Sequence, residues 1–274
     1  MANITAADVN NLRKITGAGM MDCKKALAEA DGDVEKAIDI LRKKGQKIAA
    51  NRADRATTEG CALATTNKDN TYGVIVALAC ETDFVAKNEG FIALNQAILN
   101  IALENKPADI EALKALPFQG SLTVGEKLIE QTGVIGEKID IAGYATLEGS
   151  YVTYYIHSNK KIATLVALTA EAPEAGKDVA MQVAAMNPIA LDKDSVSQDI
   201  IERELEIGRE LARQEGKPEN MIDKIAQGRL GKFFKENTLV EQEFIKEPKL
   251  SVAQYLDSVQ KGLKVTGFRR VALG

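Results

Sequence analysis

Apolar residues recur at helical spacing along the first thirty positions of the chain. The segment from Thr5 to Asp8 has the pattern of a capping box, in which two side chains satisfy the first free backbone groups of a helix. Gly17 and Gly19 interrupt the pattern, and it resumes from Met20 to Ala30. The sequence therefore predicts two helices joined by a glycine-rich turn.

A third helix is expected after Asp33, whose carboxylate can cap it. Its apolar side has the period of one helix face and comprises Val34, Ala37, Ile38 and Leu41. We expect this helix to end at Gly45, because glycine favours the left-handed conformation that closes helices. A basic stretch from Arg42 to Arg55 follows, which is typical of a solvated helix end and linker. A partner-facing patch is the alternative.

From Gly60 onwards the pattern changes to β-rich runs that alternate with helices. The expected strands are Cys61–Thr66, Tyr72–Ala79, Tyr151–Ile156 and Ile162–Thr169, and the expected helices are Asn88–Glu104 and Val179–Met186. Val76 to Glu81 resembles Val166 to Glu171, ninety positions later, with a hairpin before and a helix after each copy. We interpret this recurrence as an internal duplication that gives two related halves.

An antiparallel helical hairpin is expected over about 195–237, followed by strands at Leu239–Ile245 and Val265–Leu273. Ser195 and Gln198 have the spacing of a capping box, and Pro218 suits the first turn of the second helix. The last strand should return to the second sheet. The hairpin either packs on its own body or offers a ridge to another protein.

Composition narrows the class of protein. The chain has 274 residues, 45% hydrophobic and 27% charged, with a formal net charge of -4. That balance disfavours a nucleic-acid binder that works by broad electrostatic attraction. Neither a transmembrane run nor a signal peptide is expected, and three widely spaced cysteines are typical of reduced, buried residues in a cytoplasmic protein.

The sequence contains few candidate catalytic residues. His157 is the one histidine, and no spacing of cysteine or histidine suits a zinc site. No Gly-x-Ser-x-Gly turn offers a nucleophile to a triad containing His157. Gly17-Ala18-Gly19 lacks the preceding strand and third glycine of a phosphate loop. We expect a protein that is not an enzyme, with no cofactor and no bound metal.

Two long motifs resemble those of bacterial elongation factor Ts, a family of translation factors. Leu12 to Leu27 is similar to the N-terminal signature of the family, and Cys80 to Asn88 is similar to its second signature. Shorter agreement comes from Gly136-Glu137, Gly216-Lys217-Pro218 and the segment from Val265 to Arg270. Some members carry a further C-terminal helix, which leaves its partner contacts in doubt for a chain that stops at Gly274.

The resemblance implies an α+β fold in four parts. These are a ubiquitin-associated-like three-helix domain with a basic linker (1–53), a core subdomain N (54–141), a core subdomain C (142–188 and 238–274) and a helical hairpin (189–237) that can mediate a homodimer. Each core subdomain would pair an antiparallel sheet with a helix.

The resemblance also implies a guanine-nucleotide exchange factor for elongation factor Tu, which binds that partner in its GDP-bound and nucleotide-free forms. Thr82, Asp83 and Phe84 would form the loop that disturbs the magnesium and phosphate site of the partner. The N-terminal domain would contact the partner through Arg13, Met20 and Met21, and the core through Ile135, Gly136 and His157. Direct nucleotide binding, a membrane partner and a specific nucleic-acid partner are not expected.

Each of these residues also has a purely structural interpretation. Phe84, a few residues past a strand, is more often a core residue than a wedge, and Asp83 is more often a helix cap. Adjacent Met20 and Met21 cannot both face one core, so at least one should be exposed. His157 is typical of an exposed hairpin turn. The rival functions are an adaptor without exchange activity and an RNA-associated translation protein that uses the basic stretch.

Overall fold

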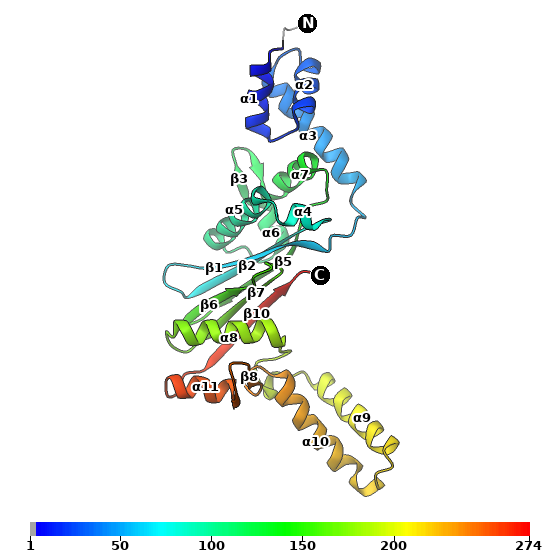
Figure 1. Ribbon diagram of the computed structural model, residues 1–274, viewed down its shortest axis with the longest axis vertical. Coiled ribbons are helices and arrows are strands. Elements are labelled where there is room, and N and C mark those ends of the chain that lie inside the picture. The colour runs from blue at the N-terminus through cyan, green and yellow to red at the C-terminus, as the bar shows by residue number, and fades with distance from the viewer. Residues whose placement is uncertain (1–3) are drawn as a thin grey trace. The chain divides into compact units, whose positions relative to one another are not determined.

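Figure 1 shows the computed structural model, which describes residues 4–274. Residues 1–3, with which the first expected domain begins, lie outside the described part. The chain divides into two compact units. Unit 1 comprises the N-terminal part up to Leu63, then Val76–Tyr144 and Ala272–Gly274, and unit 2 comprises Ala64–Ile75 and Ala145–Val271.

Unit 1 begins with three helices, α1 (Ala6–Thr16), α2 (Met20–Glu29) and α3 (Val34–Asn51). The predicted capping box is confirmed, because the Thr5 hydroxyl accepts from the Asp8 N–H while the Asp8 carboxylate accepts from the Thr5 N–H at 2.9 Å. Asp33 caps α3, as predicted. The three helices bury a common core that includes Leu12, Cys23, Leu27 and Ala37.

The prediction that Gly45 ends α3 is wrong, since the helix continues to Asn51. Gly45 serves a different purpose, which is close approach between helices. An added Cβ on Gly133 of α7 (Val124–Ile135) would lie 2.5 Å from the Gly45 Cα atom, so the two backbones touch where neither residue has a side chain. The basic stretch therefore begins inside a packed helix rather than in a linker.

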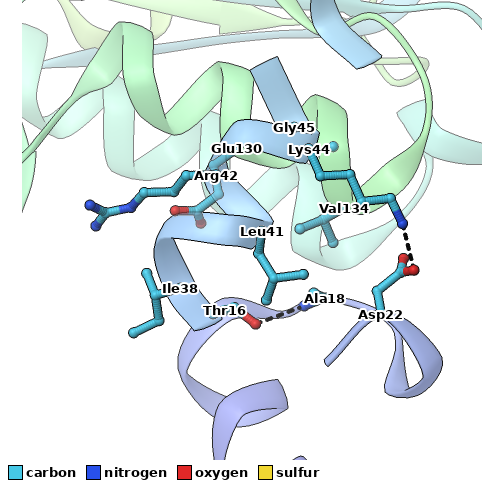
Figure 2. Close-up of a pocket in the computed structure, with 11 residues that line it drawn as sticks. Thr16, Ala18, Asp22, Ile38, Leu41, Arg42, Lys44, Gly45, Glu130 and Val134 are labelled. Atoms are coloured by element: carbon cyan, nitrogen blue, oxygen red, sulfur yellow. Dashed lines mark hydrogen bonds and ion pairs between the residues drawn. The ribbon is translucent and has the colours of Figure 1, made fainter. Parts of the chain in front are cut away.

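A small pocket lies beside this helix contact (Figure 2). It is lined by the α1–α2 turn, α3 and α7, and its volume of about 30 Å³ suits roughly one water molecule. Lys44 of α3 pairs with Asp22 of α2 at its edge. The ion pair joins α2 to α3, and the apolar contact of Val134 with the helical core joins the first helices to α7.

The other elements of unit 1 surround part of a three-stranded sheet, whose order is β1-β2-β5. Its strands are β1 (Glu59–Thr66), β2 (Tyr72–Cys80) and β5 (Asp140–Glu148), and the boundary between the two units falls within each strand. The hairpin prediction is confirmed for β1 and β2. The helices are α4 (Asp83–Ala86), α5 (Glu89–Asn105) and α6 (Ile110–Ala115), and a small ribbon contains β3 (Pro117–Gln119) and β4 (Leu122–Thr123).

Asn95 of α5 is a buried polar residue that fixes this helix to the sheet. Its side-chain amide donates to the carbonyl of Cys61 at 2.8 Å and to that of Val76 at 3.2 Å. Helix α5 agrees with the predicted range. The elements between residues 106 and 150 were not predicted, including the 12-residue helix α7 and the nine-residue strand β5.

Unit 2 contains a second three-stranded sheet with the order β10-β7-β6. Strands β6 (Tyr151–Ile156) and β7 (Ile162–Leu168) pair antiparallel, and β10 (Val265–Ala272) lies beside β7, as predicted for the last strand. Helix α8 (Pro173–Met186) covers them and starts six residues earlier than Val179, with Pro173 in its first turn. The two segments of similar sequence, which begin at Val76 and Val166, each lie at the end of the central strand of a sheet.

The helical hairpin of unit 2 consists of α9 (Gln198–Gln214) and α10 (Glu219–Asn237). The predicted capping box at Ser195 is wrong. Ser195 lies in a short 3₁₀ helix, η1 (Lys193–Ser195), where its hydroxyl donates to Asp192, and the residue at the N-cap of α9 is Ser197. Gly208 lets the helices approach, since an added Cβ would lie 3.1 Å from the Ala226 Cα atom.

The segment after the hairpin was only partly predicted. A continuous strand over Leu239–Ile245 is wrong, because the described strands there are β8 (Glu243–Phe244) and β9 (Glu247–Ser251). Helix α11 (Val252–Val259) follows and was not predicted. Phe244 stacks on Tyr255 of this helix with ring centroids 4.0 Å apart, which anchors the segment in the unit 2 core. Within residues 4–274, no helix is long and apolar enough to cross a membrane.

The contact between Gly45 and Gly133 predicts an unusual response to alanine. Alanine is normally more favourable than glycine inside a helix. Gly133→Ala should nevertheless destabilise the protein by about 1–3 kcal/mol, because the new Cβ meets the packed backbone of Gly45. Gly231→Ala in α10 is the matched control, with open space around the new Cβ, and should stabilise by about 0.5–1 kcal/mol. Calorimetric unfolding of both variants checks this, and equal effects would contradict it.

Candidate functional site

The candidate site begins where the central strand of the first sheet ends. All nine residues of β2 are buried, and the chain then leaves the sheet at Glu81. Thr82 has an extended backbone and caps α4, with its hydroxyl 3.5 Å from the Val85 N–H. Asp83 is the first residue of this one-turn helix, so the interpretation of Asp83 as the cap is wrong; Thr82 occupies that position.

Glu137 holds the start of this loop. One of its carboxylate oxygens accepts from the backbone N–H groups of Glu81 at 3.1 Å and Thr82 at 3.0 Å, and the other accepts from the Thr82 hydroxyl at 2.6 Å. In return, the Glu81 carboxylate accepts from the backbone N–H of Lys138 at 2.7 Å. We call these four residues, Glu81, Thr82, Glu137 and Lys138, the anchoring cluster.

The C-terminal end of α3 is tied to the anchoring cluster. Arg52 donates to the Glu81 carboxylate at 2.7 Å, and the Lys138 ammonium donates to the Ala53 carbonyl at 2.6 Å. The Lys138 N–H and then the Arg52 guanidinium lower the pKa of Glu81. Part of the basic stretch thus has structural partners within unit 1.

Phe84 is the most exposed large apolar side chain among the described residues, with 85% of its surface accessible. It lies four residues after the end of β2, a strand whose residues are all buried. Asp83 pairs with Lys87 at 2.6 Å, and this hydrogen bond lowers the pKa of Asp83, which keeps the carboxylate ionised. The loop therefore presents one aromatic ring beside an exposed charge pair.

Cys80 lies under the same loop. Its thiol donates to the carbonyl of Thr82 at 3.2 Å, and burial raises its pKa to about 12. A thiol with such a pKa stays protonated at neutral pH and is a poor nucleophile. Its contact supports the loop.

A second exposed surface lies at the α1–α2 turn. Met20 and Met21 are 54% and 63% exposed, so both members of the pair, rather than one, face away from the core. Arg13 is also exposed, in the last turn of α1. Ile15 is 54% exposed and was not predicted as a site residue, although its place outside the apolar face of α1 was a usable signal.

Ile135 and Gly136 lie at the C-terminal end of α7. Gly136 has φ 81° and donates its N–H to the Thr132 carbonyl, which is a conformation that glycine adopts easily. Because Glu137 is the next residue, this turn delivers the chain to the anchoring cluster. Glu137 and Arg52 were missed as site residues, since their partners in the loop are far away in sequence.

His157 belongs to unit 2, in the turn between β6 and β7. It is half-buried, which corrects the interpretation of an exposed turn residue. Its Nδ1 atom lies 3.1 Å from the Tyr155 hydroxyl, and its backbone N–H donates to the Ile162 carbonyl at 2.9 Å. Across residues 4–274, no group of three or more histidine, cysteine, aspartate or glutamate side chains is arranged to hold a metal ion.

The fold and these surfaces define an α+β protein with exposed apolar side chains suited to contact another protein. Comparison with known proteins identifies its family. The sequence model of elongation factor TS matches residues 81–274. The chain is 57% identical over 279 residues to elongation factor Ts of Flavobacterium psychrophilum, covering 100% of both chains.

Other relatives agree. The chain is 58% identical to elongation factor Ts of Amoebophilus asiaticus over 275 residues, which covers 99% of both chains. It is 57% identical to that of Christiangramia forsetii over 277 residues, which covers 100% of both. The chain therefore belongs to the elongation factor Ts family, whose members are non-catalytic nucleotide-exchange factors for elongation factor Tu.

The environment of Glu81 predicts how its pKa responds to a neighbour. In Arg52→Gln the pKa of Glu81 should rise but stay below its ordinary value, because the Lys138 N–H bond remains. Carbon NMR titration of the side-chain carboxyl measures this. Arg42→Gln is the control, since Arg42 lies near Asp39 instead.

The same shift fixes the sign of the pH dependence. Because the folded-state pKa of Glu81 lies below the unfolded one, its stabilisation is complete at neutral pH and is lost as pH falls through the folded pKa. An ordinary pKa of Glu81 in the unmodified protein would contradict the assigned hydrogen bonds.

Proposed function

We propose that this chain promotes GDP release from elongation factor Tu, and that Asp83 and Phe84 act as the wedge at the magnesium and phosphate site of the partner. The observation that carries this mechanism is the 85% exposure of Phe84 on a loop held by the anchoring cluster. A core residue would be buried, so the structural interpretation of Phe84 loses its support.

Exchange requires differential binding rather than bond chemistry. A factor that binds the nucleotide-free partner more tightly must weaken nucleotide binding by the same factor. Burying one Phe side chain contributes about 1.5–3 kcal/mol, which corresponds to roughly ten- to a hundredfold in affinity. Displacing a magnesium-bound nucleotide needs more than that, so further contacts must contribute.

Asp83 adds an electrostatic effect to the wedge. An aspartate carries a negative charge at neutral pH, so Asp83 places that charge on the loop. A carboxylate placed beside nucleotide phosphates raises their electrostatic energy and competes for the cation that they share. Lys87, which pairs with Asp83, can release it to the partner because both side chains are well exposed.

The second contact is the exposed surface formed by Arg13, Met20 and Met21, which we place on the side of the partner that holds the nucleotide base. Methionine suits this role because its flexible side chain adapts to an apolar surface. Ile135, Gly136 and His157 are proposed as further contacts from the core. The family signatures in which Met20, Met21 and the wedge occur support this assignment.

The family also suggests the domain organisation. We propose a ubiquitin-associated-like domain over 1–53, core subdomains N (54–141) and C (142–188 and 238–274), and the hairpin at 189–237. Four exposed apolar residues of the hairpin, Ile200, Ile207, Leu211 and Met221, support its use in a homodimer, which sedimentation equilibrium tests. The proposed place of action is the cytoplasm, without a cofactor, membrane or specific nucleic acid.

Removal of the Phe84 ring should slow nucleotide release. With saturating protein, Phe84→Ala should lower the rate of release of a fluorescent GDP analogue from elongation factor Tu by roughly ten- to a hundredfold. Val259→Ala, which shortens an exposed side chain of α11, is the control and should leave the rate unchanged.

The outcomes separate the rival functions. Fast release that is insensitive to Phe84→Ala would keep the exchange function and reject the wedge. Binding without accelerated release would favour the adaptor. Salt-sensitive RNA binding instead of release would favour the RNA-associated protein.

Loss of the two methionines should weaken binding more than it changes the maximal rate. Met20→Ser combined with Met21→Ser should raise the Kd for elongation factor Tu roughly ten- to a hundredfold, since apolar surface buried in the complex is lost. Titration calorimetry measures this, with Met186→Ser as a matched exposed control. An unchanged Kd would remove this surface from the interface.

A further inference from the structure

Asp83 and Phe84 lie in a helix that is too short to fix its own orientation. Helix α4 has four residues, and a helix of one turn is unstable in isolation because nucleation is unfavourable. Its orientation must therefore come from its anchors. The anchor at its N-terminal end is Thr82, two residues before Phe84.

Glu137 binds both the backbone N–H and the hydroxyl of Thr82. Its carboxylate accepts from these two groups at 3.0 and 2.6 Å. The same hydroxyl oxygen faces the Val85 N–H inside α4 at 3.5 Å. A chain of hydrogen bonds thus runs from Glu137 through Thr82 into the helix that carries Phe84. Charge-assisted bonds of this kind are stronger than neutral ones.

Glu137 differs in this respect from Glu126, a carboxylate at the start of α7. Glu126 of α7 accepts from the Thr123 N–H three residues away and closes the capping box of its own helix. The three donors to Glu137 instead lie 55 and 56 positions away, all in the loop. Glu126 serves local helix stability, whereas Glu137 serves another segment.

We propose that Glu137 is a positioning residue for nucleotide exchange, which orients the Phe84 wedge before the partner binds. This inference rests on the proposed function. A preorganised side chain does not have to be ordered during binding, and the binding free energy is then available for displacement of the nucleotide. Without Glu137 the loop would keep Phe84 exposed but would present it in many directions.

The test is a double-mutant cycle measured as the maximal rate of GDP-analogue release. Glu137→Ala should lower this rate roughly tenfold and never more than Phe84→Ala, because it acts through that ring. In a Phe84→Ala background, Glu137→Ala should have no further effect. Glu137→Gln keeps one oxygen that can accept from both N–H groups and should restore most of the rate. Glu126→Ala is the matched control and should not alter the rate.

A readout on the free protein makes the test independent of the partner. Hydrogen exchange at the amides of residues 82 and 85 should accelerate in Glu137→Ala. If that variant folds poorly, Thr82→Val replaces it, and exchange should accelerate at the Val85 amide because its hydroxyl acceptor is lost. Unchanged exchange at these amides, or additive effects of Glu137→Ala and Phe84→Ala on release, would overturn the positioning role alone. If the unmodified protein does not accelerate release, the exchange function falls, and the positioning role falls with it.

Discussion

The termination of a fully buried strand is the constraint on which the site depends. Strand β2 is covered along its whole length, and the backbone N–H groups that follow it leave the sheet without strand partners. Buried or half-buried N–H groups need acceptors, and here a carboxylate from the turn after α7 provides them. The hydrogen bonds that these N–H groups need at the end of the strand therefore also hold the base of the loop that carries Phe84.

The same turn is positioned by helix packing. Helix α7 lies against α3 where Gly45 and Gly133 bring the two backbones together. One turn beyond this contact, α7 ends and delivers Glu137, while α3 ends at Arg52, which reaches Glu81. The helices that carry Met20 and Met21 and the loop that carries Phe84 are thus connected within unit 1 by a continuous set of contacts.

The sequence predicted the helices and strands that are determined by neighbouring residues. The features that it did not predict depend on partners far away in sequence. The capping box at Thr5, the hairpin of β1 and β2, and helix α5 follow from neighbouring residues. Gly45 was misinterpreted because glycine serves both to end a helix and to let another approach, and only the partner helix decides between them. The two signature motifs pointed to Phe84, but nothing in one sequence connects Glu137 with Thr82 across 55 positions.

An exchange factor gains from a contact residue that is both exposed and ordered. In the proposed mechanism, the exposure of Phe84 leaves its apolar surface to be buried in the complex, and the bonds that hold the loop would lower the conformational entropy lost there. A flexible loop would lose part of its binding free energy to ordering, and that part could not oppose the nucleotide. Because linkage converts only differential affinity into nucleotide release, the mechanism that we propose requires a fixed base for the 82–84 loop as well as the ring of Phe84.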